Sequence, residues 1–450
     1  MNIRSLYTIL FIATYVTSIS FLTPTSQDPA PGEIIRMRTP SNRFSSFYFP
    51  FAMPHAWQVL LRSSDSFGRP THVVTTIFQP FNAVPSKVLS YQTFEDLSHL
   101  DCATLPGTVI TQIEVSFIVP ALRSGYYLVV PHYEGPTAAF GAGKQFAHAV
   151  LDSIRAALNS GNVTGIEESA RVRLMGYSDG GFTSSWAVAM QQEYTPEISG
   201  NLVGAALGGF VTNITWLVEV SDGTIVAGMV PMVFNGLCKE YPEFKELLFE
   251  FIGGDKTREW WAIHTQRCLI PLQILWLFRN FFTGKHRVFP DGFGIFEDPI
   301  IGRVTSDNSL INMDSTYTPQ VPSLIYHIYL DRIVLIKDYR EIFDKWYSWG
   351  IESCEFAEDL LNDHLTGMIP GTATALMWLA ARFDWVVPPV LGYPHTKRLL
   401  NFLYPNVSSA LLSYFEGIYD VPVGAKLGPD VRSDRLSVDG VLDALERLVG

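Results

Sequence analysis

One short run of residues has the types and spacing that nucleophilic catalysis needs: Gly176-Tyr177-Ser178-Asp179-Gly180-Gly181. It fits the pattern Gly-x-Ser-x-Gly, in which a serine lies on a sharp turn between a strand and a helix. The apolar residues 172–175 predict that strand, and residues 182–190 predict the helix. Side chains at Gly176 and Gly180 would clash in so tight a turn, and a helix N-terminus favours negative charge developing beside the serine. The pattern therefore predicts that Ser178 is a nucleophile.

A serine hydroxyl attacks well only when a base removes its proton and a third group orients that base. After this kind of turn, the expected chain order is serine, then an acid, then a histidine. Residues 323–327 predict a late strand, and Asp331 lies just beyond it. The next histidine is His364, in a predicted loop before a predicted helix over 372–383. We therefore expect Ser178, Asp331 and His364 to form a catalytic triad.

Other residues fit parts of this pattern and remain alternatives. Asp331 also has the form of an ordinary surface-turn residue, and Asp338 and Asp344 compete with it as the acid. His395 competes with His364 as the base, although it comes after the last clear helix. His327 lies within the predicted strand, where packing against neighbours is the simpler interpretation.

The elements that must position these residues follow from the apolar pattern. Short apolar segments bounded by turn residues are typical of buried parallel strands. They occur at 72–78, 87–92, 126–131, 172–175, 204–210 and 323–327. Residues 145–159 place apolar side chains on one helical face. Strands that alternate with helices predict the α/β class, with a parallel sheet covered on both sides. With the serine turn, this predicts an α/β-hydrolase fold.

The alternation of strands and helices lapses between about residues 218 and 310. This stretch is rich in bulky apolar side chains, among them Trp260, Trp261 and Trp276. It predicts a mainly helical insertion rather than more sheet. Beside a catalytic serine, such an insertion would form a cap or an acyl-binding wall. An ordinary helical core is the simpler alternative.

Composition and the N-terminal residues limit the class of protein. The 450 residues are 47% hydrophobic and 17% charged, with a formal net charge of −12. No basic run stands out, so we expect no nucleic-acid partner. Residues 1–20 predict a signal peptide, because Arg4 precedes an uncharged apolar run that ends near Ser20. A membrane anchor is the alternative. Residues 21–450 are then one secreted domain that contains the insertion.

Two further features fit export. Glycosylation sequons begin at Asn162, Asn213 and Asn406. The four cysteines, Cys102, Cys238, Cys268 and Cys354, contain no Cys-x-x-Cys pattern, so we expect no metal site. In an oxidising compartment, one or two disulfides are the natural expectation.

Longer motifs extend over nearly the whole expected mature chain. They include Pro31-Gly32-Glu33-Ile34-Ile35-Arg36, Ser90-Tyr91-Gln92 ahead of Glu95-Asp96, Leu100-Asp101-Cys102-Ala103, Tyr133-Glu134-Gly135-Pro136, Gly204-Ala205-Ala206-Leu207-Gly208-Gly209, and Ile325-Tyr326-His327 ahead of Asp331. With these motifs the chain resembles the fungal secretory lipases.

The resemblance implies an α/β-hydrolase core with an inserted helical cap and the same triad, Ser178, Asp331 and His364. It also implies that the backbone N–H groups of Asp96 and Asp179 form an oxyanion hole. By the same resemblance Cys102 pairs with Cys268 in a disulfide. Cys238 and Cys354 match no partner in the family, and we expect them to be buried thiols, with a bridge between them as the alternative.

The sequence also departs from the family pattern. His132 replaces an aspartate, and Asp179 lies where glutamine or glycine is more common. Tyr347 and Tyr393 lie at the two positions where relatives often carry a C-terminal disulfide. The family includes the trichothecene C-3 esterases, which remove an acetyl group from a sesquiterpenoid.

These departures favour a specialised member of the family. We expect ester hydrolysis without a cofactor, in which a short acyl group such as acetyl is removed from a bulky apolar alcohol such as a sesquiterpenoid. A triacylglycerol lipase is the main alternative, and an inactive binding protein is a minor one. The expected partner is a small-molecule or lipid ester, with transient contact at a lipid interface.

Overall fold

The computed structural model of the chain describes residues 29–40, 54–94, 109–252, 260–261, 269–383, 391–401 and 411–415. The predicted signal peptide over 1–20 lies outside these residues, as do Asp96, Cys102, Cys268 and Asn406. Within the described ranges, no helix is both long and apolar enough to cross a membrane.

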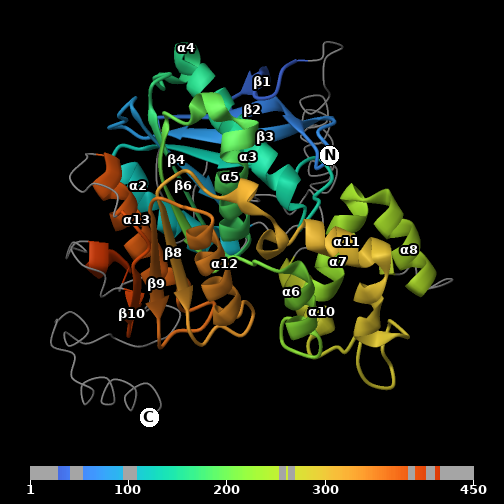
Figure 1. Cartoon of the computed structure of the whole chain (residues 1–450). Helices are drawn as coiled ribbons and strands as arrows, with labels where there is room; N and C mark the ends of the chain where they lie inside the picture. The colour runs from blue at the N-terminus through green and yellow to red at the C-terminus, as the bar shows by residue number, and fades with distance from the viewer. Residues whose placement is uncertain are drawn as a thin grey trace, which may run out of the picture.

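The described strands form one sheet in the order β1-β2-β3-β5-β4-β6-β7-β8-β9-β10 (Figure 1). Their bounds are β1 (Ile34–Arg38), β2 (His55–Ser64), β3 (Pro70–Gln79), β4 (Lys87–Gln92), β5 (Tyr127–Pro131), β6 (Arg171–Tyr177), β7 (Leu202–Gly208), β8 (Ser323–Ile328), β9 (Cys354–Asp359) and β10 (His395–Arg398). Strands β1, β2 and β3 pair antiparallel, and β3 is antiparallel to β5. From β5 through β10 every pair is parallel. This mostly parallel sheet confirms the predicted α/β class.

Helices cover both faces of the sheet. One face packs against α3 (Gly143–Asn159), α5 (Asp179–Tyr194) and α12 (Ile336–Ser348), and the other against α2 (Val109–Arg123) and α13 (Met368–Phe383). Alternate residues of β5 enter the two cores: Tyr127 and Val129 belong to the first, and Leu128 and Val130 to the second. Because successive side chains of a strand point to opposite faces, a strand buried on both sides is apolar throughout. This explains the continuous apolar runs in the sequence.

The parallel strands present their carboxyl ends at one edge of the sheet. Ser178 follows β6, Asp331 comes shortly after β8, and His364 lies between β9 and α13. Strand β7 lies between β6 and β8 in the sheet, and β8 pairs directly with β9. The topology therefore gathers three residues that are far apart in the sequence.

The regular elements described between β7 and β8 are helices, joined by turns and loops. It contains α6 (Ile214–Ser221), α7 (Met229–Glu240), α8 (Pro242–Ile252), α10 (Leu269–Trp276), α11 (Pro299–Asp307) and the short helices η3 (Gly292–Glu297), η4 (Leu310–Asn312) and η5 (Ser315–Tyr317). In Figure 1 helices α6, α7, α8, α10 and α11 form a green-to-gold group beside the sheet.

Aromatic rings form the interior of this insertion. Phe234 of α7 contacts Phe282 and Phe289, with ring centroids 6.0 and 5.5 Å away. Trp260 and Trp276 both contact Phe281, with ring centroids 5.6 and 5.4 Å away. The two tryptophans thus pack inside the insertion itself, which is the role that the simpler interpretation of the sequence gave them.

The insertion leaves and rejoins the rest of the chain at one place. The Thr212 carbonyl accepts a hydrogen bond from the Ile311 N–H at 3.1 Å, and Ser309 Oγ accepts one from the Ile214 N–H at 2.8 Å. Lys345 of α12 donates to the Ile311 carbonyl at 2.6 Å. We call residues 212–214 together with 309–311 the stem of the insertion.

Candidate active site

Ser178 lies at the junction of β6 and α5 in a strained backbone conformation, with φ 56° and ψ −118°. Residues other than glycine rarely adopt positive φ, and such strain costs about 1–3 kcal/mol. The surrounding backbone holds it in place. The Ser178 N–H donates to Gly208 O of β7 at 2.9 Å, and Ser178 O accepts from the Phe182 N–H at 2.8 Å. A strained residue kept by its surroundings is typical of a functional site.

The glycines beside Ser178 have no room for a side chain. A Cβ atom on Gly176 would lie 2.1 Å from Gly180 O, and one on Gly180 would lie 2.0 Å from Gln92 O. A Cβ atom on Gly181 would lie 2.1 Å from Gly208 O. In each case the neighbour is backbone of the sheet or of the turn, so it has little freedom to move aside. The close approach of α5 to the sheet therefore requires glycine at all three positions.

The three residues expected to form the triad lie within hydrogen-bond distance of one another. Ser178 Oγ is 2.9 Å from His364 Nε2, and His364 Nδ1 is 2.6 Å from Asp331 Oδ2. His364 and Asp331 are buried, with 6% and 4% of their surface exposed. The hydroxyl, the imidazole and the carboxylate form one continuous chain, which allows proton transfer from the serine to a histidine that a charged group orients.

The carboxylate of Asp331 is fixed by its own loop. Its Oδ1 accepts hydrogen bonds from the N–H groups of Ile333 and Val334 at 2.8 and 2.9 Å, which leaves Oδ2 to His364. Burial alone would raise the pKa of Asp331. The charge and hydrogen bond of His364, with smaller contributions from His327 and the Val334 N–H, outweigh burial and lower the pKa below its ordinary value. Asp331 is therefore ionised at neutral pH and faces the histidine.

The expected oxyanion-hole residues are described in part. Asp179 is the first residue of α5, where backbone N–H groups have no partner within the helix. Tyr133 Oη is 2.6 Å from Asp179 Oδ2 and also hydrogen-bonds to Thr93 O. Thr93 precedes Asp96 by three residues, and Asp96 itself lies outside the described residues. Tyr133 thus connects the N-terminus of α5 to the segment that leads to Asp96.

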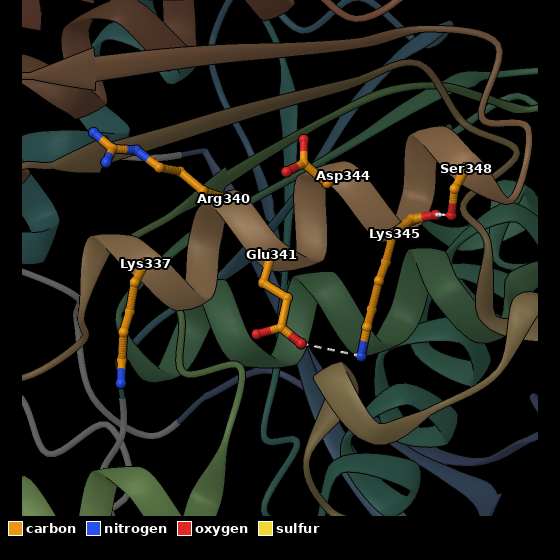
Figure 2. A pocket seen from close by; sticks show the side chains of 6 residues that line it. All are labelled: Lys337, Arg340, Glu341, Asp344, Lys345 and Ser348. Atoms are coloured by element: carbon orange, nitrogen blue, oxygen red, sulfur yellow. Dashed lines mark hydrogen bonds and ion pairs between the residues drawn. The ribbon is translucent and has the colours of Figure 1, made fainter.

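The residues that competed with the triad in sequence have other surroundings. Asp338 and Asp344 both lie on α12. Figure 2 shows Asp344 beside Lys337, Arg340, Glu341 and Lys345, which line a charged surface pocket on that helix. His395 lies on β10, where its Nε2 is 2.8 Å from Glu358 Oε2 and its ring stacks on Phe356. Asp338, Asp344 and His395 therefore lie outside the hydrogen-bonded chain that joins Ser178, His364 and Asp331.

The cysteines and sequons are also described in part. Cys238 and Cys354 are free and buried, which confirms the expectation of buried thiols. Asn162 is exposed on the short helix α4 (Gly161–Thr164). Asn213 is half-buried and caps α6, because its side chain accepts from the Trp216 N–H at 3.1 Å. Of these two sequons, the one at Asn162 is the more accessible to a glycosylating enzyme.

The chain is similar to known proteins in sequence and in fold. The family model for secretory lipases matches residues 101–388. The chain belongs to the secretory lipase family. Lipase 1 of Candida albicans is 44% identical over 429 residues, covering 93% of this chain and 91% of the relative. Lipase 2 of the same yeast is also 44% identical, covering 97% of this chain and 98% of the relative. Membership of the secretory lipase family confirms the predicted enzyme class, a serine carboxylic-ester hydrolase.

Solved structures confirm the predicted fold. Candida antarctica lipase A matches with a TM-score of 0.74 at 23% identity, over 88% of this chain and 94% of that structure. A mutant of the rice cell wall degrading esterase LipA from Xanthomonas oryzae matches with a TM-score of 0.58 at 15% identity, over 80% and 97% of the two chains. At such identities the likeness concerns the fold alone, and it is the α/β-hydrolase fold.

Two tyrosines contact the site, although no motif predicted a role for them. Tyr133 contacts Asp179, as described above. Tyr177 donates its hydroxyl to the backbone oxygen of His364 at 2.6 Å, so it anchors the loop that carries the histidine. A buried tyrosine usually needs a hydrogen-bond partner for its hydroxyl. Tyr177 directly precedes the serine, but its partner is 187 residues away in the chain, so only the fold reveals it.

Proposed function

We propose that Ser178, His364 and Asp331 carry out ester hydrolysis in this family member, as nucleophile, general base and orienting acid. The observation that carries the proposal is the unbroken chain from Ser178 Oγ to His364 Nε2 at 2.9 Å and from His364 Nδ1 to Asp331 Oδ2 at 2.6 Å. Asp331 accepts from Nδ1, so the lone pair of the neutral imidazole is on Nε2, facing the hydroxyl.

In the acylation step, Ser178 Oγ attacks the ester carbonyl carbon while His364 Nε2 takes the hydroxyl proton. The carbonyl oxygen becomes an oxyanion, and the backbone N–H groups of Asp179 and Asp96 are proposed to stabilise it. Each such donor is typically worth ~10²–10³ in rate. The tetrahedral intermediate then collapses, and His364 returns the proton to the leaving alcohol oxygen.

In the deacylation step, His364 takes a proton from a water molecule that attacks the acyl carbon. The second intermediate collapses, releasing the carboxylic acid, and Ser178 Oγ regains its proton from His364. All the groups that these two steps need are protein side chains, backbone amides and water.

For the substrate, we propose a lipid ester as the leading class. The related Candida albicans proteins are named lipases and match over nearly their full length. Apolar side chains next to the triad are exposed: Leu330 beside Asp331 by 49%, and Leu365 beside His364 by 67%. On the insertion Ile274 and Phe278 are 65% and 64% exposed. Exposed apolar side chains directly beside the triad, as at Leu330 and Leu365, favour an apolar ester or a lipid surface.

A short acyl ester of a bulky apolar alcohol, such as a sesquiterpenoid acetate, is the second candidate. The departures from the family pattern favour it, and one of them, Asp179, lies directly beside the nucleophile, where it accepts a hydrogen bond from Tyr133 at 2.6 Å. Under either candidate, we propose that the helical segment over about 218–310 acts as a cap that contributes to substrate choice.

We also propose that the chain is exported. The pattern of residues 1–20 and the family name support this. In an oxidising compartment the Cys102–Cys268 disulfide and glycans at Asn162, Asn213 and Asn406 are the accompanying proposals.

The test is a hydrolysis panel on the purified protein with acetyl, butyryl and long-chain esters, acetylated sesquiterpenoids and emulsified triolein. The triad proposal predicts one organophosphonate adduct per chain at Ser178, located by mass spectrometry, and no adduct in Ser178→Ala. A rate on triolein that exceeds the acetyl esters identifies the lipid ester. Faster turnover of the sesquiterpenoid acetate identifies the second candidate, and labelling at another residue overturns the triad.

A further inference from the structure

A second histidine, His327, lies next to the acid of the triad. It is on β8, and none of its surface is exposed. Its Nε2 is 2.9 Å from Val334 O, and its Nδ1 is 3.9 Å from Asp331 Oδ2, beyond hydrogen-bond distance. Its ring stacks on Tyr339 of α12, with centroids 3.7 Å apart and planes 1° apart. The catalytic steps described above do not use this side chain.

The contact with Val334 connects His327 to the carboxylate. Val334 O can only accept, so Nε2 of His327 carries the proton and donates it. The N–H group of the same residue donates to Asp331 Oδ1 at 2.9 Å. His327 therefore holds the backbone oxygen of Val334, and the backbone N–H of Val334 holds the carboxylate of Asp331. The residues between β8 and Val334 form a closed loop with the catalytic acid inside it.

We propose that His327 is a positioning residue for the catalytic acid: it holds the Asp331 loop through Val334 and, as a neutral ring, leaves Asp331 Oδ2 to His364. This proposal rests on the triad roles proposed above. The ring presents an unprotonated Nδ1 to the carboxylate, and that nitrogen has no hydrogen-bond partner in the described structure. A second proton on Nδ1 would place a competing positive donor beside the oxygen that orients His364.

The surroundings of His327 keep the ring neutral. Burial lowers the pKa of His327 to about 4, against the opposing charge of Asp331. The other titratable groups that face it are His364, Glu358 of β9 and the stacked Tyr339. At neutral pH the ring therefore acts as a fixed hydrogen-bond donor and not as a charge.

Three variants separate the hydrogen bond from the packing. His327→Phe keeps a ring that can stack on Tyr339 but removes the donor. His327→Gln loses the ring but carries an amide nitrogen near the place of Nε2. His327→Asn carries an amide that is too short to reach Val334. If His327→Phe does not fold, the comparison of the Gln and Asn variants decides, because both are amides of similar polarity.

His148 provides a matched control. It is also a buried histidine, stacked on Tyr194 with centroids 4.1 Å apart, and its Nδ1 is 3.0 Å from the backbone oxygen of Asp65. Burial lowers its pKa to about 4 as well. Tyr194 is the last residue of α5 and Ser178 precedes the first, so the two ends are about 24 Å apart at the usual helix rise. His148→Phe should therefore affect stability without affecting catalysis.

The readouts are kcat, KM, the rate of organophosphonate labelling of Ser178, and the melting temperature. We expect His327→Phe and His327→Asn to lower kcat and the labelling rate about 10- to 100-fold with KM little changed, as misplaced catalytic groups do. We expect His327→Gln to stay within about threefold of the wild type, and His148→Phe to lower only the melting temperature. Equal kcat in all the His327 variants, or equal losses in Gln and Asn, overturns the positioning role. If Ser178→Ala retains activity, the triad assignment fails instead, whatever the His327 variants show.

Discussion

At the scale of single residues, the reaction should depend strongly on the charge of Asp331, after the nucleophile Ser178 and the base His364. Replacing Asp331 by Asn keeps the size of the side chain but removes the negative charge 2.6 Å from His364 Nδ1. We expect kcat to fall about 10⁴-fold in Asp331→Asn and about 10⁶-fold in Ser178→Ala. Steady-state kinetics on a soluble ester measures both.

His395→Ala is the control for that series, because His395, on β10, bonds to Glu358 of β9 and not to the serine. We expect its kcat to remain near the wild-type value, whereas His364→Ala should be nearly inactive. The opposite pattern, with His395 essential and His364 dispensable, would show that the base has been assigned to the wrong histidine.

Asp338 leads to a prediction on stability and pH. Burial, aided by Glu341, raises the pKa of Asp338 from 3.8 to about 6. A raised pKa in the folded state means that the protonated carboxyl stabilises the fold at acid pH, and that this stability is lost as pH rises through about 6. At pH 8 the buried charge is a cost that Asp338→Asn removes. We expect this variant to be about 1 kcal/mol more stable at pH 8, with the gain disappearing near pH 4; denaturant unfolding at both pH values measures it.

At the scale of elements, two aromatic rings join α12 to β10 where relatives often carry a disulfide. Tyr347 of α12 stacks on Tyr393, with centroids 3.4 Å apart, and Phe343 contacts Tyr393 from the side at 5.8 Å. A non-covalent ring pair thus occupies the place of the cross-link. We expect a double-mutant cycle with Tyr347→Ala and Tyr393→Ala to give a coupling of about 0.5–1.5 kcal/mol. Tyr347→Phe, which keeps the ring, should change stability little; an additive cycle would show that the stacking contributes nothing.

The sequence predicted the central strands well because they are buried on both faces and therefore apolar throughout. The predicted segments 87–92 and 323–327 match β4 and β8 almost residue for residue. Strand β9 was not predicted, although it lies between β8 and β10 in the sheet. It carries Glu355, Glu358 and Asp359, all buried. Hydropathy cannot reveal such a strand, because the groups that offset its acids come from elsewhere in the chain.

Those groups belong to elements distant in sequence. Glu355 accepts hydrogen bonds from Trp378 and Arg382 of α13. Glu358 bonds to Arg340 of α12 and to His395 of β10. The same limit applies at the candidate site. A local pattern identifies Ser178 and its glycines, whereas the contact of His327 with Val334 and that of Tyr177 with His364 depend on packing.

At the scale of the whole molecule, the reactivity of the four cysteine thiols tests the proposed disulfide between Cys102 and Cys268. Cys238 and Cys354 are 3% and 0% exposed, and burial raises the pKa of both. A buried thiol with little thiolate reacts slowly. We expect neither to react with iodoacetamide in the native protein and both to react after denaturation without a reductant. Mass spectrometry of the digest should also show Cys102 linked to Cys268; labelling of all four cysteines would refute that disulfide.

The stem is one of several places where the insertion is held against the rest of the chain. Backbone and side-chain hydrogen bonds between Thr212 and Ile311 and between Ile214 and Ser309 close the excursion where it starts. Residues 215–308 also contact the rest of the chain outside the stem: Glu240 Oε1 accepts from the Ser66 N–H at 2.6 Å, Lys239 donates to Ala138 O at 3.1 Å, and Asn308 Oδ1 accepts from the Gly143 N–H at 3.0 Å. A segment of a relative grafted between the two ends of the stem would therefore have to reproduce these contacts as well. A graft that kept only the stem would leave the buried Gly143 N–H at the start of α3 without its acceptor, and an unsatisfied buried donor costs about 1–3 kcal/mol.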